Sequence, residues 1–346
     1  MYFFVSSICL IKNSATLLGQ GGALTVLSSV KNPTTGALAG WFCTALIQSS
    51  GAFDSIVIAL VSANVLPMST AVATIIGAEV GTTITSQLTS VMGYMRREKH
   101  LLRSSFIIAM MHYCYNIGTF LICLPLEQFF GVFTNLAIFG GNVFTRIPGL
   151  SAIPSILDLV TPWTHILLDY IPAWGGFVSG ILLLILSLIN LEKYMTLVFA
   201  SGASKRLIQS TFGSPFRSFI SGLTFTIIVP STSVMVSILI PLAATGVLKE
   251  EHHLMPYILG ANVGTVIDVM LAALATGNPT AIGVWLVHLA INIIGAVIFL
   301  PLLKPFTLFV RKVNDFLTFS KKRLIAFLGI SNGLFFIILV IGILMS

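Results

Sequence analysis

The sequence predicts an all-α polytopic membrane protein with two inverted-topology repeats, each containing a re-entrant helical hairpin and a broken transmembrane helix. Composition, an internal repeat and the distribution of basic residues lead to this prediction. Of 346 residues, 56% are hydrophobic and 8% are charged, and the mean hydropathy is +1.00. Soluble domains carry about 25% charged residues, so this chain has too few to cover a surface that faces water. We therefore expect a lipid bilayer around it.

Three segments of the first half recur, in the same order, in the second half. "GWFCTALIQSS" from Gly40 corresponds to "GLTFTIIVPST" from Gly222, at an offset of 182 residues. "IIGAEVGTTI" corresponds to "ILGANVGTVI" at an offset of 183, and "HYCYNIGTFLICLPL" to "HLAINIIGAVIFLPL" at an offset of 176. Chance similarity between apolar segments would not keep three polar motifs in order, which indicates a duplication.

Each repeat begins with a helix, expected at about 1–18 and about 172–200. Two apolar arms around a polar tip follow, at about 36–47 with 51–64 and about 218–229 with 233–245. A helix that spans a bilayer needs about 20 residues, and these arms are shorter. The arms therefore predict re-entrant hairpins.

The third element of each repeat is an interrupted helix and the fourth is a full span. Interruptions are expected at Gly81-Thr82-Thr83 and Gly264-Thr265, within about 69–93 and 253–275. The full spans are expected at about 102–125 and 281–301. The predicted organisation is a first repeat at 1–126 (hairpin about 36–64), an external segment at 127–171, a second repeat at 172–303 (hairpin about 218–245), and a basic cytoplasmic linker with a final transmembrane helix at 304–346.

Basic residues indicate that the repeats are inverted. Each repeat crosses the membrane three times, so the second enters in the opposite orientation. That arrangement gathers 15 of the 18 Lys and Arg residues on one side, in 94–103, 193–217, 246–253 and 302–323. The basic side of a membrane protein is cytoplasmic. We expect a plasma-membrane protein with a cytoplasmic N-terminus and an external C-terminus. The net charge of +7 then marks loops, and no nucleic-acid partner is expected.

Hydroxyl and amide side chains are concentrated at the two hairpin tips. Polar backbone at membrane depth occurs only where protein buries it or where it lines a cavity. Helix N-termini carry partial positive charge and suit an oxyanion, while hydroxyl and carbonyl oxygens suit sodium. Alternatively, small residues there simply allow helices to pack closely. The candidate substrate-binding residues are Gln48, Ser49, Ser50, Ser231, Thr232 and Ser233.

Three acidic residues have no acidic equivalent in the other repeat: Asp54, Glu79 and Asp268 align with Val236, Asn262 and Thr85. Acids inside a membrane are costly and commonly serve ion or proton coupling, although each could also be a paired structural acid. Glu79 precedes a predicted helix break, where it must bind a cation, pair with a neighbour or hold a proton. The candidate ion-coupling residues are Glu79, Thr82, Thr83, Asn262, Thr265, Asp54 and Asp268.

A histidine and an asparagine recur at i and i+4 in the fourth element of each repeat. These residues, His112 with Asn116 and His288 with Asn292, are expected to form interhelical hydrogen bonds that hold the scaffold together. The sequence has no HExxH or other metal-binding spacing. No metal site beyond possible sodium ions is expected.

The motifs "TALIQSS", "GAEVGTT" and "HYCYNIG", followed by "PSTS", "GANVGT" and "HLAIN", resemble those of the sodium/phosphate cotransporter family, type II and its bacterial relatives. The resemblance covers about 36–126 and 218–303. In that family a Gln-Ser-Ser-Ser motif in each repeat contributes to binding phosphate and sodium. It implicates the tip residues above, and Thr82, Thr83, Asn262 and Thr265 would line the same cavity. The chain departs from the pattern at Gly51, Pro230 and Glu79.

The function expected from the resemblance is sodium-coupled uptake of inorganic phosphate by alternating access, with sodium as the coupling ion and no other cofactor. Two transport alternatives remain open, namely another small oxyanion and proton coupling. A membrane-embedded lipid-pyrophosphate phosphatase is a further alternative. Phosphoryl transfer usually needs an Arg or metal clamp, and no Arg or Lys lies near either tip. We therefore expect a transporter and not an enzyme. The oligomeric state stays open.

Overall fold

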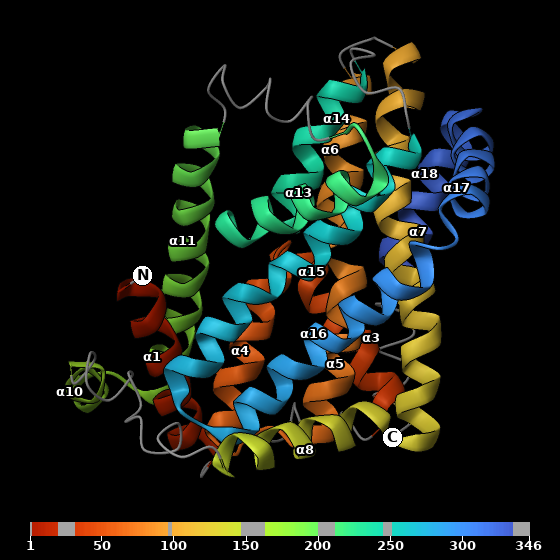
Figure 1. Ribbon diagram of the computed structural model, residues 1–346. Coiled ribbons are helices and arrows are strands. Elements are labelled where there is room, and N and C mark those ends of the chain that lie inside the picture. Colours follow the sequence, from red (N-terminus) through yellow and green to blue (C-terminus); the bar gives the residue numbers. More distant parts are fainter. Residues whose placement is uncertain are drawn as a thin grey trace.

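The computed structural model describes residues 2–19, 32–95, 99–146, 163–199, 212–244 and 251–334 (Figure 1). Within these ranges the protein consists of helices joined by short turns, without a β-strand. This agrees with the predicted all-α class. In the described part of the chain, three helices are long and apolar enough to cross a membrane: Arg103–Phe130, His253–Thr276 and Pro279–Phe299.

The helices follow the predicted order in both halves. The first half contains α1 (Tyr2–Gly19), α3 (Pro33–Ile47), α4 (Ser50–Ser62), α5 (Met68–Gly81), α6 (Thr83–Met95) and α7 (Lys99–Phe130). The described residues between the halves form α8 (Val132–Arg146) and α10 (Trp163–Tyr170). The second half contains α11 (Ala173–Phe199), α13 (Pro215–Ile228), α14 (Thr232–Ala244), α15 (Glu251–Thr276) and α16 (Pro279–Phe299).

The chain continues into a basic segment that packs beside α7. It contains α17 (Leu303–Thr318), α18 (Lys321–Gly329) and a π-helical turn at Ile330–Leu334. Residues 335–346 of the predicted final segment lie outside the described residues. The same holds for 147–162 of the predicted external segment.

Helices α3 and α13, the first arms of the two predicted hairpins, start in the same way. Asn32 caps α3 by accepting a hydrogen bond from the Thr35 N–H, and Ser214 caps α13 in the same manner. A proline follows each cap, where its missing N–H costs nothing and its fixed φ favours helix. The two starts are 182 residues apart, which is the offset of the hairpin motifs. Local sequence thus starts α3 and α13 at equivalent positions.

Glycines allow the first arm of each half to pack directly on its third element. A Cβ on Gly77 would lie 1.7 Å from the Ala37 carbonyl oxygen of α3, and a Cβ on Gly260 would lie 2.0 Å from the Phe219 carbonyl oxygen of α13. Gly40 and Gly222 approach α5 and α15 equally closely. Small residues at helix crossings are typical of membrane proteins, where backbones must approach without a hydrophobic driving force. The two halves therefore share the same helix–helix contact.

Gly77→Ala is expected to destabilise the protein, because its methyl group would overlap a backbone carbonyl that cannot rotate away. Overpacking of this kind costs about 1–3 kcal/mol. The measurement is the thermal midpoint of the purified protein in detergent. Gly329→Ala is the control, since a Cβ there meets no atom within 4 Å. A Gly77→Ala midpoint equal to that of the control would show that α3 and α5 are not in close contact.

The predicted interruption of the third element is present in only one half. In the first half α5 ends at Gly81 and α6 begins at Thr83. Here the Thr82 hydroxyl donates to the Ala78 carbonyl and the Thr83 hydroxyl to the Val80 carbonyl. Such bonds compete with the helix backbone. The prediction of a break at Gly264-Thr265 was wrong, because α15 runs through it. Val266 occupies the place of Thr83 and has no hydroxyl with which to compete.

Candidate functional site

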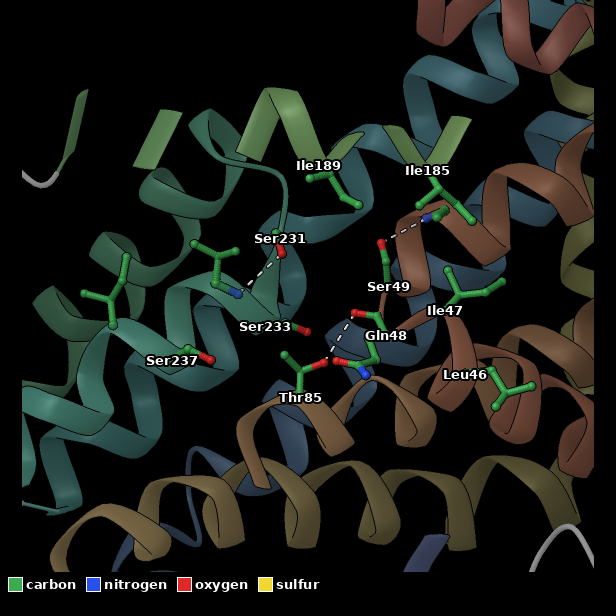
Figure 2. Close-up of a pocket in the computed structure, with 13 residues that line it drawn as sticks. Leu46, Ile47, Gln48, Ser49, Thr85, Ile185, Ile189, Ser231, Ser233 and Ser237 are labelled. Carbon is green, nitrogen blue, oxygen red and sulfur yellow. Dashed lines mark hydrogen bonds between the residues drawn. The ribbon is translucent and has the colours of Figure 1, made fainter. Parts of the chain in front are cut away.

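A cavity of about 630 Å³ lies between the α3–α4 turn and the α13–α14 turn, the tips of the two predicted hairpins (Figure 2). Its polar walls come from residues of both halves, and two isoleucines of α11 contribute an apolar wall. No Lys or Arg belongs to the lining among the described residues. The polar lining residues are Gln48, Ser49, Thr85, Ser231, Ser233 and Ser237.

Two helix N-termini border the cavity, one from each half. Ser49 caps α4, with its hydroxyl oxygen accepting from the Ala52 N–H at 3.2 Å. The Ser231 hydroxyl oxygen accepts from the Val234 N–H at 3.4 Å, at the start of α14. A helix N-terminus carries about half a positive charge. The cavity therefore has electropositive ends on two sides without a basic side chain.

The turn between α3 and α4 depends on an unusual backbone conformation. Gln48 has φ of 60° and lies in the left-handed region, which only a few per cent of non-glycine residues adopt. Its carbonyl oxygen accepts a hydrogen bond of 3.4 Å from the Thr85 hydroxyl of α6. The Gln48 side chain lines the cavity beside Ser233 (Figure 2). Pro230 takes the equivalent position in the second half and lacks this amide.

Four of the six predicted substrate-binding residues line the cavity: Gln48, Ser49, Ser231 and Ser233. Ser50 and Thr232 are buried outside the lining, and the Thr232 hydroxyl donates to the Ala261 carbonyl of α15 at 3.2 Å. The sequence analysis missed Thr85, Ser237 and the isoleucines of α11. The symmetry of the motifs pointed to Thr85, because it aligns with Asp268, but nothing in uniformly apolar α11 marked a lining residue.

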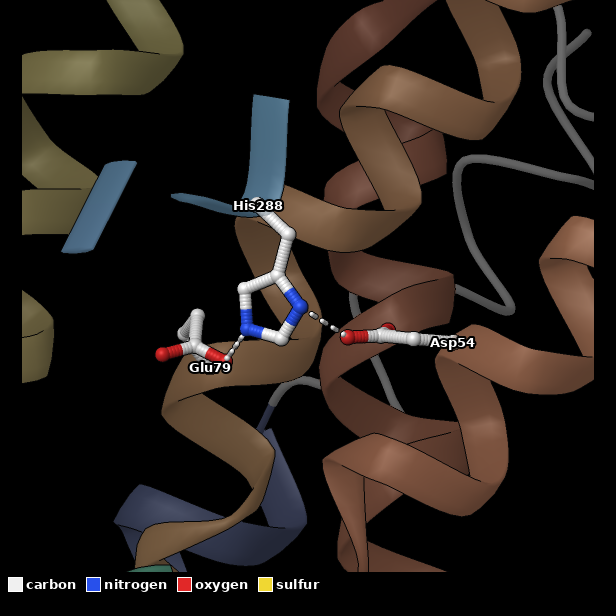
Figure 3. Close-up of side chains that lie close together, drawn as sticks. All are labelled: Asp54, Glu79 and His288. Atoms are coloured by element: carbon white, nitrogen blue, oxygen red, sulfur yellow. Dashed lines mark hydrogen bonds and ion pairs between the residues drawn. The ribbon is translucent and has the colours of Figure 1, made fainter. Parts of the chain in front are cut away.

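His288 of α16 lies between Asp54 of α4 and Glu79 of α5 (Figure 3). Its Nε2 atom is 2.9 Å from Glu79 Oε1 and its Nδ1 atom is 3.1 Å from Asp54 Oδ2. The side chains of His288 and Asp54 are fully buried. We call these three residues the Asp54–His288–Glu79 triad. Glu79 was expected to bind a cation, pair with a neighbour or hold a proton, and in the structure it pairs with a neighbour. The partner is His288, which the sequence analysis expected to form a structural interhelical hydrogen bond.

The triad does not have the geometry of a metal centre. One ligand atom from each residue lies within 4.8 Å of the others, which is close enough for a metal ion in principle. However, the two ring nitrogens point in opposite directions, each toward a different carboxylate (Figure 3). A metal site needs its ligand atoms to converge on one point. The ring itself occupies the space between the carboxylates.

A neutral counterpart of the triad lies at the equivalent place in the other half. His112, which aligns with His288, faces Asn262, which aligns with Glu79. The other ring nitrogen of His112, Nδ1, is 3.3 Å from the Ser86 hydroxyl. Each histidine therefore reaches the third element of the opposite half. His288 contacts two carboxylates directly, whereas His112 faces neutral groups and interacts with the Glu79 charge at longer range.

Asp268 of α15 lies against the tip of the first hairpin. Its Oδ2 atom is 1.6 Å from the place that a Cβ on Gly51 would take. The missing third serine of the family motif and the additional acid are thus neighbours in space. In the other half, the equivalent positions are Ser233 and Thr85, and both line the cavity.

The remaining candidate ion-coupling residues surround the helix break and its counterpart. Thr82, Thr83, Asn262 and Thr265 are all buried. The Ser233 hydroxyl of α14 donates to the Thr82 carbonyl at 3.4 Å. Because Ser233 lines the cavity and Thr82 is three residues from Glu79, this contact connects the cavity to the triad.

A family model described as Na+/Pi-cotransporter matches residues 3–143 and 183–341. The chain is 25% identical over 382 residues to "Sodium-dependent phosphate transport protein 2A" of Mus musculus, covering 87% of this chain and 60% of that protein. It is 26% identical over 409 residues to "Sodium-dependent phosphate transport protein 2B" of Homo sapiens, covering 89% and 58%. The chain thus spans about three fifths of the length of these relatives. No solved structure matches it.

Proposed function

This chain belongs to the Na+/Pi-cotransporter family, as its paired motifs predicted, and we propose that it carries inorganic phosphate across the cell membrane together with sodium ions. The observation that carries the proposal is the cavity between the hairpin tips, which two capped helix N-termini face. Such termini bind anions through free N–H groups and partial positive charge. The names of the relatives support phosphate and sodium as the transported species.

The fold is proposed to consist of two inverted repeats with re-entrant hairpins. Figure 1 supports this arrangement, with α3, α4 and α5 in the lower half of the view and α13 and α14 in the upper half. The equivalent caps and glycine contacts of the two halves support it further. Alternating access then follows if the hairpins move against the remaining helices and open the cavity to one side at a time.

The upper end in Figure 1 is proposed to face the cytoplasm. The basic helices α17 and α18 lie there beside α7, and six exposed residues carry their charge: Lys304, Arg311, Lys312, Lys321, Lys322 and Arg323. Basic residues on one side indicate the cytoplasmic face. This assigns the first hairpin to the external side and the second to the cytoplasmic side.

Gln48, Ser49, Ser231 and Ser233 are proposed to contact phosphate, with Ser50 and Thr232 holding the tips in place. Oxygen atoms around the helix break, at Thr82, Thr83 and Thr265, are the proposed sodium ligands, because a hard cation prefers hydroxyl and carbonyl oxygens. The absence of a basic clamp from the cavity suits a substrate that must leave as well as enter. Family membership also favours transport over the phosphatase that the sequence left open.

Uptake of labelled phosphate into proteoliposomes tests the proposal. An inward sodium gradient should drive accumulation, and replacing sodium with choline should abolish it. Ser231→Ala should reduce the rate by about tenfold, because it removes both a cavity hydroxyl and the cap of α14, worth about 1 kcal/mol. Ser221→Ala is the matched control, since its hydroxyl bonds to the Arg217 carbonyl on α13, away from the cavity lining.

Equal uptake in sodium and choline would contradict sodium coupling. Normal uptake by Ser231→Ala would mean that the tips serve only packing. Competition of sulfate and arsenate with labelled phosphate decides whether the site is specific for phosphate or accepts other oxyanions. Strong competition by sulfate would favour the broader oxyanion function, whereas competition by arsenate alone fits a site for phosphate.

A further inference from the structure

The Asp54–His288–Glu79 triad needs more protons than a neutral histidine and two carboxylates supply. The Nε2···Oε1 contact of 2.9 Å with Glu79 is a hydrogen bond and needs one hydrogen between its atoms. The Nδ1···Oδ2 contact of 3.1 Å with Asp54 is an ion pair, which also needs a proton because nitrogen and oxygen would otherwise meet as two lone pairs. A neutral imidazole carries a single N–H, so it satisfies one contact and leaves two acceptors facing each other at the second. At least one further proton is therefore bound, and the triad then has a net charge of −1.

Among the described residues of the helices that form the triad, α4, α5 and α16, no lysine or arginine balances that remaining charge. The titratable groups facing it from neighbouring helices are Asp268 of α15 and His112 and Tyr115 of α7. The carboxylate of Asp268 adds negative charge. An uncompensated buried charge is unfavourable, so the triad is a place where one more proton binds.

Asp54 is the carboxylate best suited to receive this proton. Its side chain is fully buried, and neither oxygen has a hydrogen-bond partner among the described residues. Its contact with His288 is an ion pair that engages a single oxygen, Oδ2. Glu79, by comparison, forms a hydrogen bond with His288 Nε2. The oxygen Oδ1 of Asp54 is therefore left for a proton.

We propose that the Asp54–His288–Glu79 triad is a proton-binding site that exchanges one proton with the aqueous phase in each transport cycle. The triad alternates between a net charge of −1 and neutrality. The proton enters from water on one side and leaves to water on the other. The proposal has two parts, proton binding by the triad and coupling of that proton to transport. The second part rests on the proposed function, and it means that protons as well as sodium drive the carrier. Proton binding itself does not depend on which substrate is carried.

The triad is connected to the cavity by two routes. Ser49, the cap of α4, and Ala52 in α4 line the cavity, and Asp54 is two residues after Ala52 in the same helix. On the second route, Ser233 bonds to the carbonyl of Thr82, at the break that follows Glu79. A movement of the hairpin tips would thus shift both carboxylates relative to His288. This provides the physical link between substrate binding and proton release.

Infrared difference spectroscopy of the purified protein between acidic and alkaline pH measures proton binding without transport. We expect a carboxylic-acid band that titrates in the wild type and is lost or shifted in Glu79→Gln and Asp54→Asn. Both variants keep the size of the side chain and an oxygen acceptor. Glu127→Gln is the matched control, because Glu127 is a buried carboxylate that caps α8 away from the triad. No titrating band, or a band unchanged in both variants, would overturn the proton site.

Proteoliposomes with equal sodium on both sides and an acidic exterior test the coupling. The wild type and Glu127→Gln should accumulate phosphate, and Glu79→Gln should lose this accumulation. Glu79→Asn, which copies Asn262 of the other half, serves as a second variant and should also lose it. Sodium-driven uptake by the wild type without accumulation in the proton gradient would overturn coupling alone. Absence of sodium-driven uptake would instead contradict the proposed function, and the infrared result would still decide the proton site.

Discussion

Replacing His288 with phenylalanine should destabilise the protein by about 3–5 kcal/mol, the cost of leaving a buried charge without its partner. Phenylalanine keeps a planar ring in the same space but removes both nitrogens. Asp54 and Glu79 would then face an apolar ring. Neither carboxylate has another ion-pair partner among the described residues. The measurement is the thermal midpoint in detergent, together with the yield of monodisperse protein.

His112→Phe is the matched control, since the two histidines occupy equivalent positions. His112 faces Asn262 and Ser86, which are neutral, and it makes no ion pair with Glu79, whose charge acts on it only at longer range. Loss of neutral hydrogen bonds costs about 1–3 kcal/mol, so the control should be less damaging. Adding Glu79→Gln to His288→Phe should recover part of the stability, because it removes one of the orphaned charges. Equal losses in the two single variants would mean that the triad carries no buried charge.

The helix boundaries were predictable because local signals set them. Polar tips divided two apolar stretches into arms too short to cross a membrane, and the ends of α3, α4, α13 and α14 follow those tips. The error at Gly264-Thr265 arose from treating the two Gly-Thr motifs as equivalent. In the first half, adjacent threonine hydroxyls bond to the preceding turn, and the second half lacks one of them.

The triad was less predictable, because its pairing is a property of packing. Glu79 and His288 are 209 residues apart, and no local pattern fixes which helix faces lie together. Sequence symmetry did mark Asp54 and Glu79 as acids without equivalents. It also treated the two histidines as alike, whereas their partners differ in charge. The difference between the repeats at Asp54 and Glu79 was visible in the sequence. Only the fold shows that both acids contact His288.

Serine at Gly51 would complete the Gln-Ser-Ser-Ser motif of the family, yet we expect Gly51→Ser to impair the protein. A Cβ at this position would lie 1.6 Å from Asp268 Oδ2, so the carboxylate must move. Asp268 is 3% exposed and its Oδ1 accepts from the Val269 N–H at 2.7 Å. Overpacking alone costs about 1–3 kcal/mol, and a displaced buried carboxylate adds to this cost. Thermal midpoints and sodium-driven phosphate uptake should both fall.

The other half of the molecule indicates how to restore this variant. There the position of Gly51 is taken by Ser233 and the position of Asp268 by Thr85, and both side chains are accommodated at the cavity wall. Adding Asp268→Thr to Gly51→Ser should therefore recover most of the lost stability. A double-mutant cycle with Asp268→Thr alone should give a coupling energy of about 0.5–3 kcal/mol in favour of the pair. Additive effects would show that Gly51 and Asp268 do not compete for the same space. A positive coupling would mean that the family motif is incomplete here because a carboxylate occupies the volume of the missing serine.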